Sequence, residues 1–175
     1  MPRRPLRFDP VAEARRNWRE QGWHEAADGM AMITSVMRMH QIFLARVDDS
    51  LAPFGLTFAR YEVLMLLTFT RDGQLPLGKI GQRLQVHPAS VTNVIDRLEG
   101  DGLVQRRPHP SDLRTTLAAI TSKGRRVGAA ATEVLNRDVF ADVGAPRESL
   151  DGLFDSMAAM RCAAGDFELA TQPSH

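Results

Sequence analysis

Apolar residues between Leu75 and Ile120 predict two helices followed by two strands. At helical spacing they form two groups, which are Ile80 and Leu84, then Val91, Ile95 and Leu98. Intervals of three and four residues place each group on one face of a helix. Two short apolar segments, 103–107 and 115–120, then enclose a loop with two prolines, which indicates paired strands.

Boundary residues support these elements. Pro88 suits the first position of the second helix, and Gly102 suits the left-handed position that ends it. Thr121 is expected to cap the helix that follows the strands. Helix, short turn, helix and hairpin in this order form a winged helix-turn-helix. That arrangement delivers one helix to the major groove of DNA and a charged loop to the flanking backbone or minor groove.

Further helices are expected on both sides of this unit, over residues 10–27, 28–52, 57–69, 121–143 and from 147 onward. Gly22 weakens the first of them and is a candidate break in it, and Thr57 is expected to cap the third. The 28–52 segment carries one apolar stripe at three- and four-residue spacing: Met30, Ile33, Met37, His40, Leu44, Val47 and Leu51. Such a stripe is a seam for packing against other helices.

Composition places the chain among folded proteins of the cytoplasm. Its 175 residues are 43% hydrophobic and 25% charged, and its one cysteine, Cys162, excludes an internal disulfide. No segment has the roughly 18 consecutive apolar residues of a membrane span, and no apolar signal region follows the basic N-terminus. We therefore expect a cytoplasmic protein without membrane contact.

Local charge points to nucleic acid, although the net charge is only +1. Between residues 103 and 126, Asp112 stands against six cations: Arg106, Arg107, Arg114, Lys123, Arg125 and Arg126. Cations concentrated in this way neutralise phosphates and release condensed counterions.

The segments LAPFGLTFARYEVLMLL, LPLGKIGQRLQVHPASVTNVIDRLEGDGLV and RRPHPSDLRTTLAAITSKG together resemble the MarR family of winged-helix transcription regulators. The resemblance covers residues 51–124. It implies a mainly α fold with a β-hairpin wing, an obligate homodimer, and a pseudo-palindromic operator in double-stranded DNA, often released by a small ligand. The family commonly has Asp-Arg-Arg in the wing, where this chain has Asp112-Leu113-Arg114.

This resemblance divides the chain into three regions. Residues 1–27 form an N-terminal extension helix, residues 28–56 and 121–175 a helical dimerisation region, and residues 57–120 the DNA-binding lobe. The expected function is a repressor with the recognition helix 88–101 in the major groove and the wing 106–114 on the backbone or minor groove. The alternative is a protein-binding adaptor that lacks operator specificity.

Candidate DNA contacts lie on the recognition helix, and they are Pro88, Ala89, Ser90, Thr92, Asn93 and Arg97. Asn pairs with adenine through two hydrogen bonds, and Ser or Thr with several bases. Arg97 suits a phosphate, or an ion pair with Glu99 or Asp101. Taken alone, these residues also fit an ordinary solvated helix face.

The wing adds Arg106, Arg107, Asp112 and Arg114. An arginine on an extended loop can enter an A·T-rich minor groove, so Arg114 is the strongest candidate. Asp112 is expected to hold Arg114 or another arginine through a charge-assisted hydrogen bond. For Arg106 and Arg107 the sequence does not separate a backbone contact from plain surface charge.

A pocket for a small aromatic or anionic effector is expected near His40, the polar member of the apolar stripe. Weaker candidates for this pocket are Trp18, Trp23, Arg46 and Tyr61. For all five, ordinary packing is the default interpretation, and the pocket is the alternative. We expect no enzyme, cofactor or metal, because His24-Glu25 lacks the second histidine of a zinc helix, and C-x-x-C, P-loop and nucleophile-elbow patterns do not occur.

Overall fold

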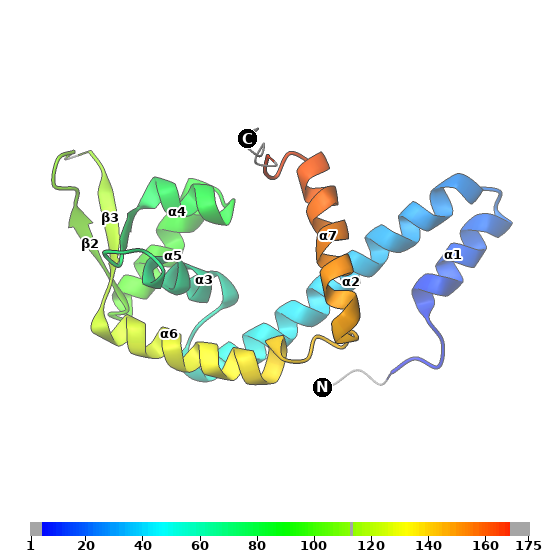
Figure 1. Cartoon of the computed structure of the whole chain (residues 1–175), viewed down its shortest axis with the longest axis horizontal. Helices are drawn as coiled ribbons and strands as arrows, with labels where there is room; N and C mark the ends of the chain where they lie inside the picture. The colour runs from blue at the N-terminus through cyan, green and yellow to red at the C-terminus, as the bar shows by residue number, and fades with distance from the viewer. Residues whose placement is uncertain (1–4, 113, 169–175) are drawn as a thin grey trace, which may run out of the picture. The chain divides into compact units, whose positions relative to one another are not determined.

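The computed structural model describes residues 5–112 and 114–168 (Figure 1). Its elements in chain order are α1 (Pro10–Glu20), α2 (His24–Leu51), the 3₁₀ turn η1 (Ala52–Phe54), α3 (Phe58–Thr68), β1 (Gln74–Pro76), α4 (Leu77–Leu84), α5 (Pro88–Gly100), β2 (Val104–Pro108), β3 (Thr116–Ile120), α6 (Ser122–Leu135), the π-helical turn η2 (Asn136–Phe140) and α7 (Arg147–Ala163). They form two compact units that divide between Val139 and Phe140. The mainly helical fold class predicted from the sequence is confirmed.

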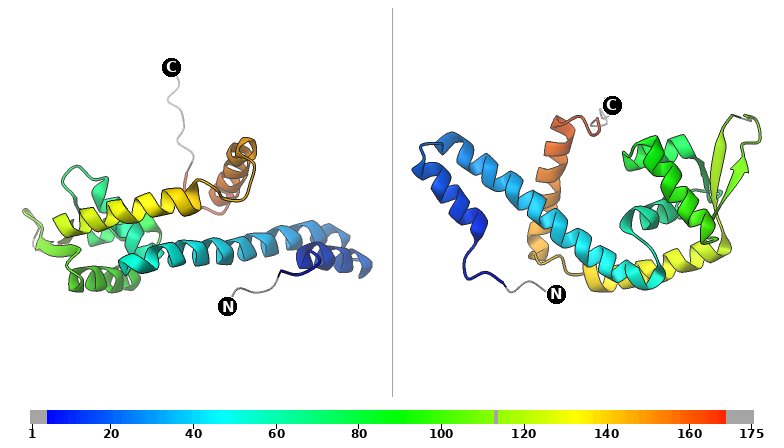
Figure 2. Two further views of the ribbon diagram at one scale, coloured as in Figure 1. Left: turned by 90° about the horizontal axis from the view of Figure 1, so that it is seen from below. Right: turned by 180° about the vertical axis from the view of Figure 1, so that it is seen from behind.

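In the first unit, α1 folds back along the N-terminal part of α2 (Figures 1 and 2). The helix expected over 10–27 is divided at the candidate break, because Gly22 adopts a left-handed φ of 84° and α2 already begins at His24. Asp28 on α2 then pairs with two arginines of α1, Arg15 at 2.6 Å and Arg19 at 2.9 Å. These ion pairs link the two helices of the hairpin, and all three side chains are about half exposed or more.

The apolar side chains of helix α2 are buried near its C-terminus and exposed further upstream. Val47 and Leu51, near its C-terminus, are buried in the core of the first unit. Further upstream, large apolar side chains are exposed over a broad face of the helix: Met32, Ile33, Val36, Met37, Met39, Ile42 and Leu44. An exposed apolar face of this size is normally covered by other protein.

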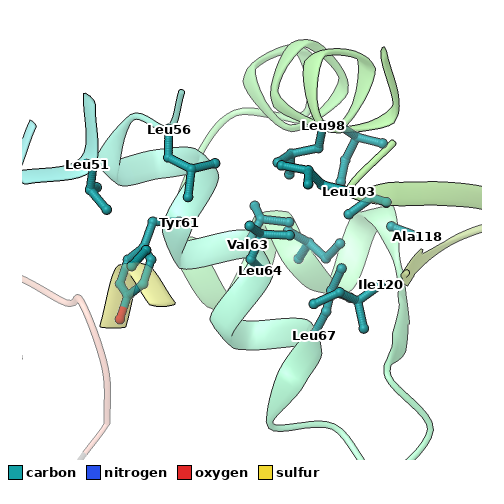
Figure 3. Packing of buried hydrophobic residues seen from close by; sticks show 14 of the residues in the cluster. Leu51, Leu56, Tyr61, Val63, Leu64, Leu67, Leu98, Leu103, Ala118 and Ile120 are labelled. Atoms are coloured by element: carbon teal, nitrogen blue, oxygen red, sulfur yellow. The ribbon is translucent and has the colours of Figure 1, made fainter. Parts of the chain in front are cut away.

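The DNA-binding lobe predicted from the sequence is built on a three-stranded antiparallel sheet of order β1-β3-β2. Ala118 on the central strand pairs with Leu75 on one side and Arg106 on the other. The core joins this sheet to α3 and α5. Figure 3 shows Leu98 and Leu103 packed toward α3, while Ile120 lies beside Leu67.

The ends of the helices confirm most of the predicted boundaries. Pro88 opens α5, Gly102 follows it with a φ of 70°, and Thr121 Oγ1 accepts the Gly124 N–H at 3.0 Å. The expected side-chain cap from Thr57 is wrong, since its hydroxyl accepts no bond from α3.

Instead, Asp48 near the end of α2 accepts the free Phe58 N–H of α3 at 3.2 Å. The first turn of α3 is thereby attached to α2. Helix α6 ends at Leu135, short of the predicted Val143, because the backbone widens into η2 from Asn136.

The second unit contains α7, which begins at the predicted Arg147. One of its stripes leaves large apolar residues exposed, and they are Leu153, Phe154, Met157 and Met160. Among residues 5–112 and 114–168, no single helix is long and apolar enough to cross a membrane, and α2 and α3 pass that test only as a pair bent by 71°.

We predict that Gly124→Ala destabilises the lobe by about 2–3 kcal/mol, because packed backbone cannot absorb an added methyl group. A Cβ at Gly124 would lie 2.1 Å from the Leu103 carbonyl oxygen. Urea unfolding followed by circular dichroism measures the loss. Gly100→Ala is the control, since a Cβ there has no neighbour within 4 Å among the described residues. Equal stability of wild type and Gly124→Ala would contradict the contact.

Candidate nucleic-acid interface

Helix α5 has one buried face and one open face. Val91, Ile95 and Leu98 are at most 3% exposed and pack into the lobe. The predicted contact residues Pro88, Ala89, Ser90, Thr92, Asn93 and Arg97 are all exposed. The first turn of α5 is therefore open to a ligand as large as a DNA duplex.

Hydrogen bonds within α5 hold two of these side chains. Arg97 Nε donates to Asn93 Oδ1 at 3.1 Å, and Thr92 Oγ1 donates to the Pro88 carbonyl at 3.2 Å. The partner of Arg97 is thus Asn93, rather than Glu99 or Asp101. The Asn93 oxygen keeps a second lone pair and the amide keeps its N–H groups, so a two-bond contact with adenine stays available.

Arg106 fastens the first wing strand to α5. Its guanidinium binds Glu99 Oε2 at 2.5 Å through Nη1 and Asp96 Oδ1 at 2.6 Å through Nη2, while its backbone N–H donates to Glu99 Oε1 at 2.8 Å. The backbone bond, followed by the guanidinium, lowers the pKa of Glu99 below its ordinary value. Both ends of the guanidinium are engaged, so Arg106 joins strand to helix instead of reaching outward. Its neighbour Arg107 is exposed.

Asp112 orders the tip of the wing. Its Oδ2 accepts the Thr115 hydroxyl at 2.7 Å, and its Oδ1 accepts the Arg114 backbone N–H at 3.0 Å. These two bonds lower the pKa of the carboxyl, the hydroxyl bond most. Asp112 therefore holds Arg114 by a charge-assisted hydrogen bond, as expected, and the donor is the peptide N–H of Arg114. Leu113 lies outside the described residues.

Two adjacent hollows connect the start of α5 with the wing. One lies between α4 and α5 and includes Pro88 and Thr92. The other lies between α4 and the wing and includes Lys79, His109 and Arg114. Gly78 and Gln82 line both, so the first turns of α4 stand between the recognition helix and the wing arginine.

Lys79 and His109 were not among the residues proposed from the sequence. Lys79 directly precedes the buried Ile80, so it lies on the open side of α4. This position could have identified Lys79 as a candidate DNA contact from the sequence. His109 was hidden in a loop whose path the sequence does not give.

The five effector candidates do not share one site within a single chain. Trp18 and Trp23 meet edge to face at 5.2 Å and line a hollow at the turn between α1 and α2. Arg46 lies 23 residues beyond Trp23 on α2, about 35 Å along a helix.

The other three candidates have different surroundings. Arg46 donates to the Asp138 carbonyl at 3.0 Å. Tyr61 is buried, and its hydroxyl bonds Thr132 Oγ1 at 3.0 Å; Figure 3 shows this ring pointing away from α5. His40 is exposed on α2. Within residues 5–112 and 114–168, no three His, Cys, Asp or Glu side chains gather as a metal site.

A helix-turn-helix with a β-hairpin wing on a three-stranded sheet defines the winged-helix class of proteins. The MarR family model matches residues 56–116. The crystal structure of Sco5413, a MarR family transcriptional regulator from Streptomyces coelicolor, is 51% identical, with a TM-score of 0.74 over 81% of this chain and 99% of that one. The chain belongs to the MarR family of transcriptional regulators.

Two further relatives extend the comparison. The transcriptional regulator MhqR of Bacillus subtilis is 32% identical over 62% of this chain and 68% of its own. CouR from Rhodococcus jostii RHA1, solved with bound p-coumaroyl-CoA, is 25% identical over 78% of this chain and 93% of that one, with a TM-score of 0.65. Matches to the first curated relatives span between 42% and 68% of those proteins.

The clamp at Arg106 predicts a specific acid response. The pKa of Glu99 is lowered in the folded state, so its stabilising contribution is complete above its ordinary value of 4.5 and disappears as the pH falls through the folded value. Arg106→Met should lower the melting temperature by a few degrees at pH 7. Between pH 5 and 3, the melting temperature of this variant should then fall by less than that of wild type. Melting curves across this range measure the effect. Arg107→Met, its exposed neighbour, should keep the wild-type acid loss, and an unchanged acid loss in Arg106→Met would refute the clamp.

Proposed function

We propose that this chain represses transcription as a homodimer that binds a pseudo-palindromic operator in double-stranded DNA. The observation that carries the proposal is the arrangement around α4, where the open turn of α5 lies on one side and Arg114 of the wing on the other. Membership of the MarR family supports it. The cytoplasm, where operator DNA is accessible, is the proposed location.

In this proposal α5 enters the major groove, and Ser90, Thr92 and Asn93 contact base edges. Arg114 enters the neighbouring minor groove. Lys79, which lines the hollow between the two, contacts the phosphate backbone that connects the grooves. Arg97 and Arg107 serve as further phosphate contacts. Asp112 and Arg106 position these groups and do not touch DNA.

A homodimer fits the exposed apolar surface of α2. Two recognition helices must lie about 34 Å apart to enter successive major grooves on one face of DNA. The apolar stretch from Met32 to Leu44 supplies a surface that a second copy would cover. The apolar stripe of α7 provides a second such surface.

A small aromatic or anionic effector would relieve repression by favouring a dimer with the wrong separation of recognition helices. The loss of operator affinity then equals the difference in effector binding between the two states. The p-coumaroyl-CoA bound to CouR carries an aromatic ring and anionic phosphates, which supports an effector of the aromatic or anionic class. The Trp18–Trp23 corner and the His40 region are separate candidate contacts.

The direct test is a titration of the protein against a duplex selected from a random pool, followed by fluorescence anisotropy. We expect binding of the selected duplex at least about 10³-fold tighter than of a scrambled one, with affinity falling steeply as salt rises. Equal affinity for both duplexes would favour the adaptor alternative.

We predict that Arg114→Ala weakens operator binding about 10- to 100-fold and lowers the salt dependence by about one counterion. Asp112→Ala should weaken it less, because the loop loses its order but keeps the cation. Gel-shift titrations at several salt concentrations measure both. Arg16→Ala, a largely exposed arginine on α1, is the charge-matched control. Unchanged affinity of Arg114→Ala would rule out the wing contact.

We also predict that Met37→Glu, which places a charge at a side chain that is 65% exposed in the single chain, weakens dimerisation by about 30-fold or more. Sedimentation velocity at micromolar concentration should show single subunits. Asn17→Glu, at an exposed polar position of α1, should remain dimeric. A dimer of unchanged affinity in Met37→Glu would place the subunit contact elsewhere.

A further inference from the structure

An arginine that is largely shielded from solvent joins the end of the recognition helix to the end of the long helix α2. Arg60, in the first turn of α3, has a side chain that is only 12% exposed. Its Nη2 pairs with a carboxylate oxygen of Asp101, the residue that caps α5. Its Nη1 donates to the Gly55 carbonyl at 2.6 Å. One guanidinium therefore spans two junctions that lie far apart in the sequence.

Further hydrogen bonds hold the backbone at each of these two junctions. Gly55 has a left-handed φ of 64°, and its N–H donates to Ala52 at 3.0 Å, which closes the turn that ends α2 and η1. On the other side, Lys123 of α6 donates to the Asp101 carbonyl at 2.8 Å. Arg60 thus bonds directly to both the exit of α2 and the exit of α5, and α6 holds the latter as well.

The contact between Arg60 and Asp101 depends on a single counterion. The Arg60 Nε is buried and has no partner among the described residues, so the guanidinium is placed by its two Nη contacts alone. Asp101 is the only ion-pair partner that the structure assigns to it there. Because the Arg60 side chain is only 12% exposed, loss of its counterion leaves a poorly hydrated charge, and the surrounding chain relaxes to hydrate it.

A small rotation at this junction has a large effect at the DNA. The 13 residues of α5 place its first turn about 20 Å from Asp101 along the helix axis. A turn of about 10° there moves that end by about 3.5 Å, close to the roughly 3.4 Å rise of one base pair. In a twofold dimer both ends move.

We propose that the Arg60–Asp101 pair is a positioning link that sets the separation of the two recognition helices, and so the spacing of operator half-sites that the dimer accepts. The proposal rests on the proposed function, because it needs a dimer that reads two half-sites. Arg60 and Asp101 do not contact DNA. They fix the orientation of α5 relative to α2, which carries the apolar surface assigned to the dimer.

The test compares three duplexes: the selected operator, and the same half-sites with one base pair added or removed between them. Wild type should prefer the native spacing by about tenfold or more, a cost comparable to one mismatched base pair. Asp101→Asn keeps the shape and removes the charge at a side chain that is 55% exposed, so the variant is expected to fold. Its preference for the native spacing should fall to about twofold, through weaker binding of the native duplex.

Arg60→Lys keeps the charge but reaches one acceptor only, and it should give an intermediate preference. Asp72→Asn, an exposed aspartate in the turn before β1, is the matched control and should behave as wild type. A variant that binds all three duplexes more weakly by the same factor would show a general loss of stability and overturn the link. If wild type itself shows no preference among the duplexes, the proposed function fails instead.

Discussion

Burial of Val91, Ile95 and Leu98 determines which side of the recognition helix faces outward, and the rest of the interface depends on it. These three side chains hold α5 against α3 and the sheet, so Ser90 and Asn93 must lie on the open side. Polar residues at these positions would not make a DNA-binding helix without this packing. The specificity of the surface therefore begins in the hydrophobic core.

Carboxylates of the lobe act mainly on the protein itself. Glu99 holds Arg106 against α5, Asp112 orders the wing through peptide and hydroxyl bonds, and Asp101 pairs with Arg60. Anionic groups so close to DNA would repel phosphates if they faced them. Asp112 thereby orders the wing segment that carries Arg114.

The sequence predicted the winged helix within one or two residues, because Pro88, Gly102 and Thr121 are strong local boundary signals. It failed where a distant partner decides the structure. Asp48 replaces the Thr57 cap from ten residues away, and the break at Gly22 was underestimated since both flanking segments favour helix. Among the site residues, the exposed face of α5 was predictable from the spacing of its apolar residues. The clamp at Arg106 was not, because strand-to-helix geometry brings its partners together.

The central claim is that two copies present α5 and the wing to one face of a duplex with twofold symmetry. Hydroxyl-radical footprinting on a selected duplex tests this most directly. The account predicts two equivalent protected patches, related by a dyad and centred about 34 Å apart, each with a minor-groove protection on its outer side. A single unsymmetrical patch, or protection spread evenly along the duplex, would contradict it.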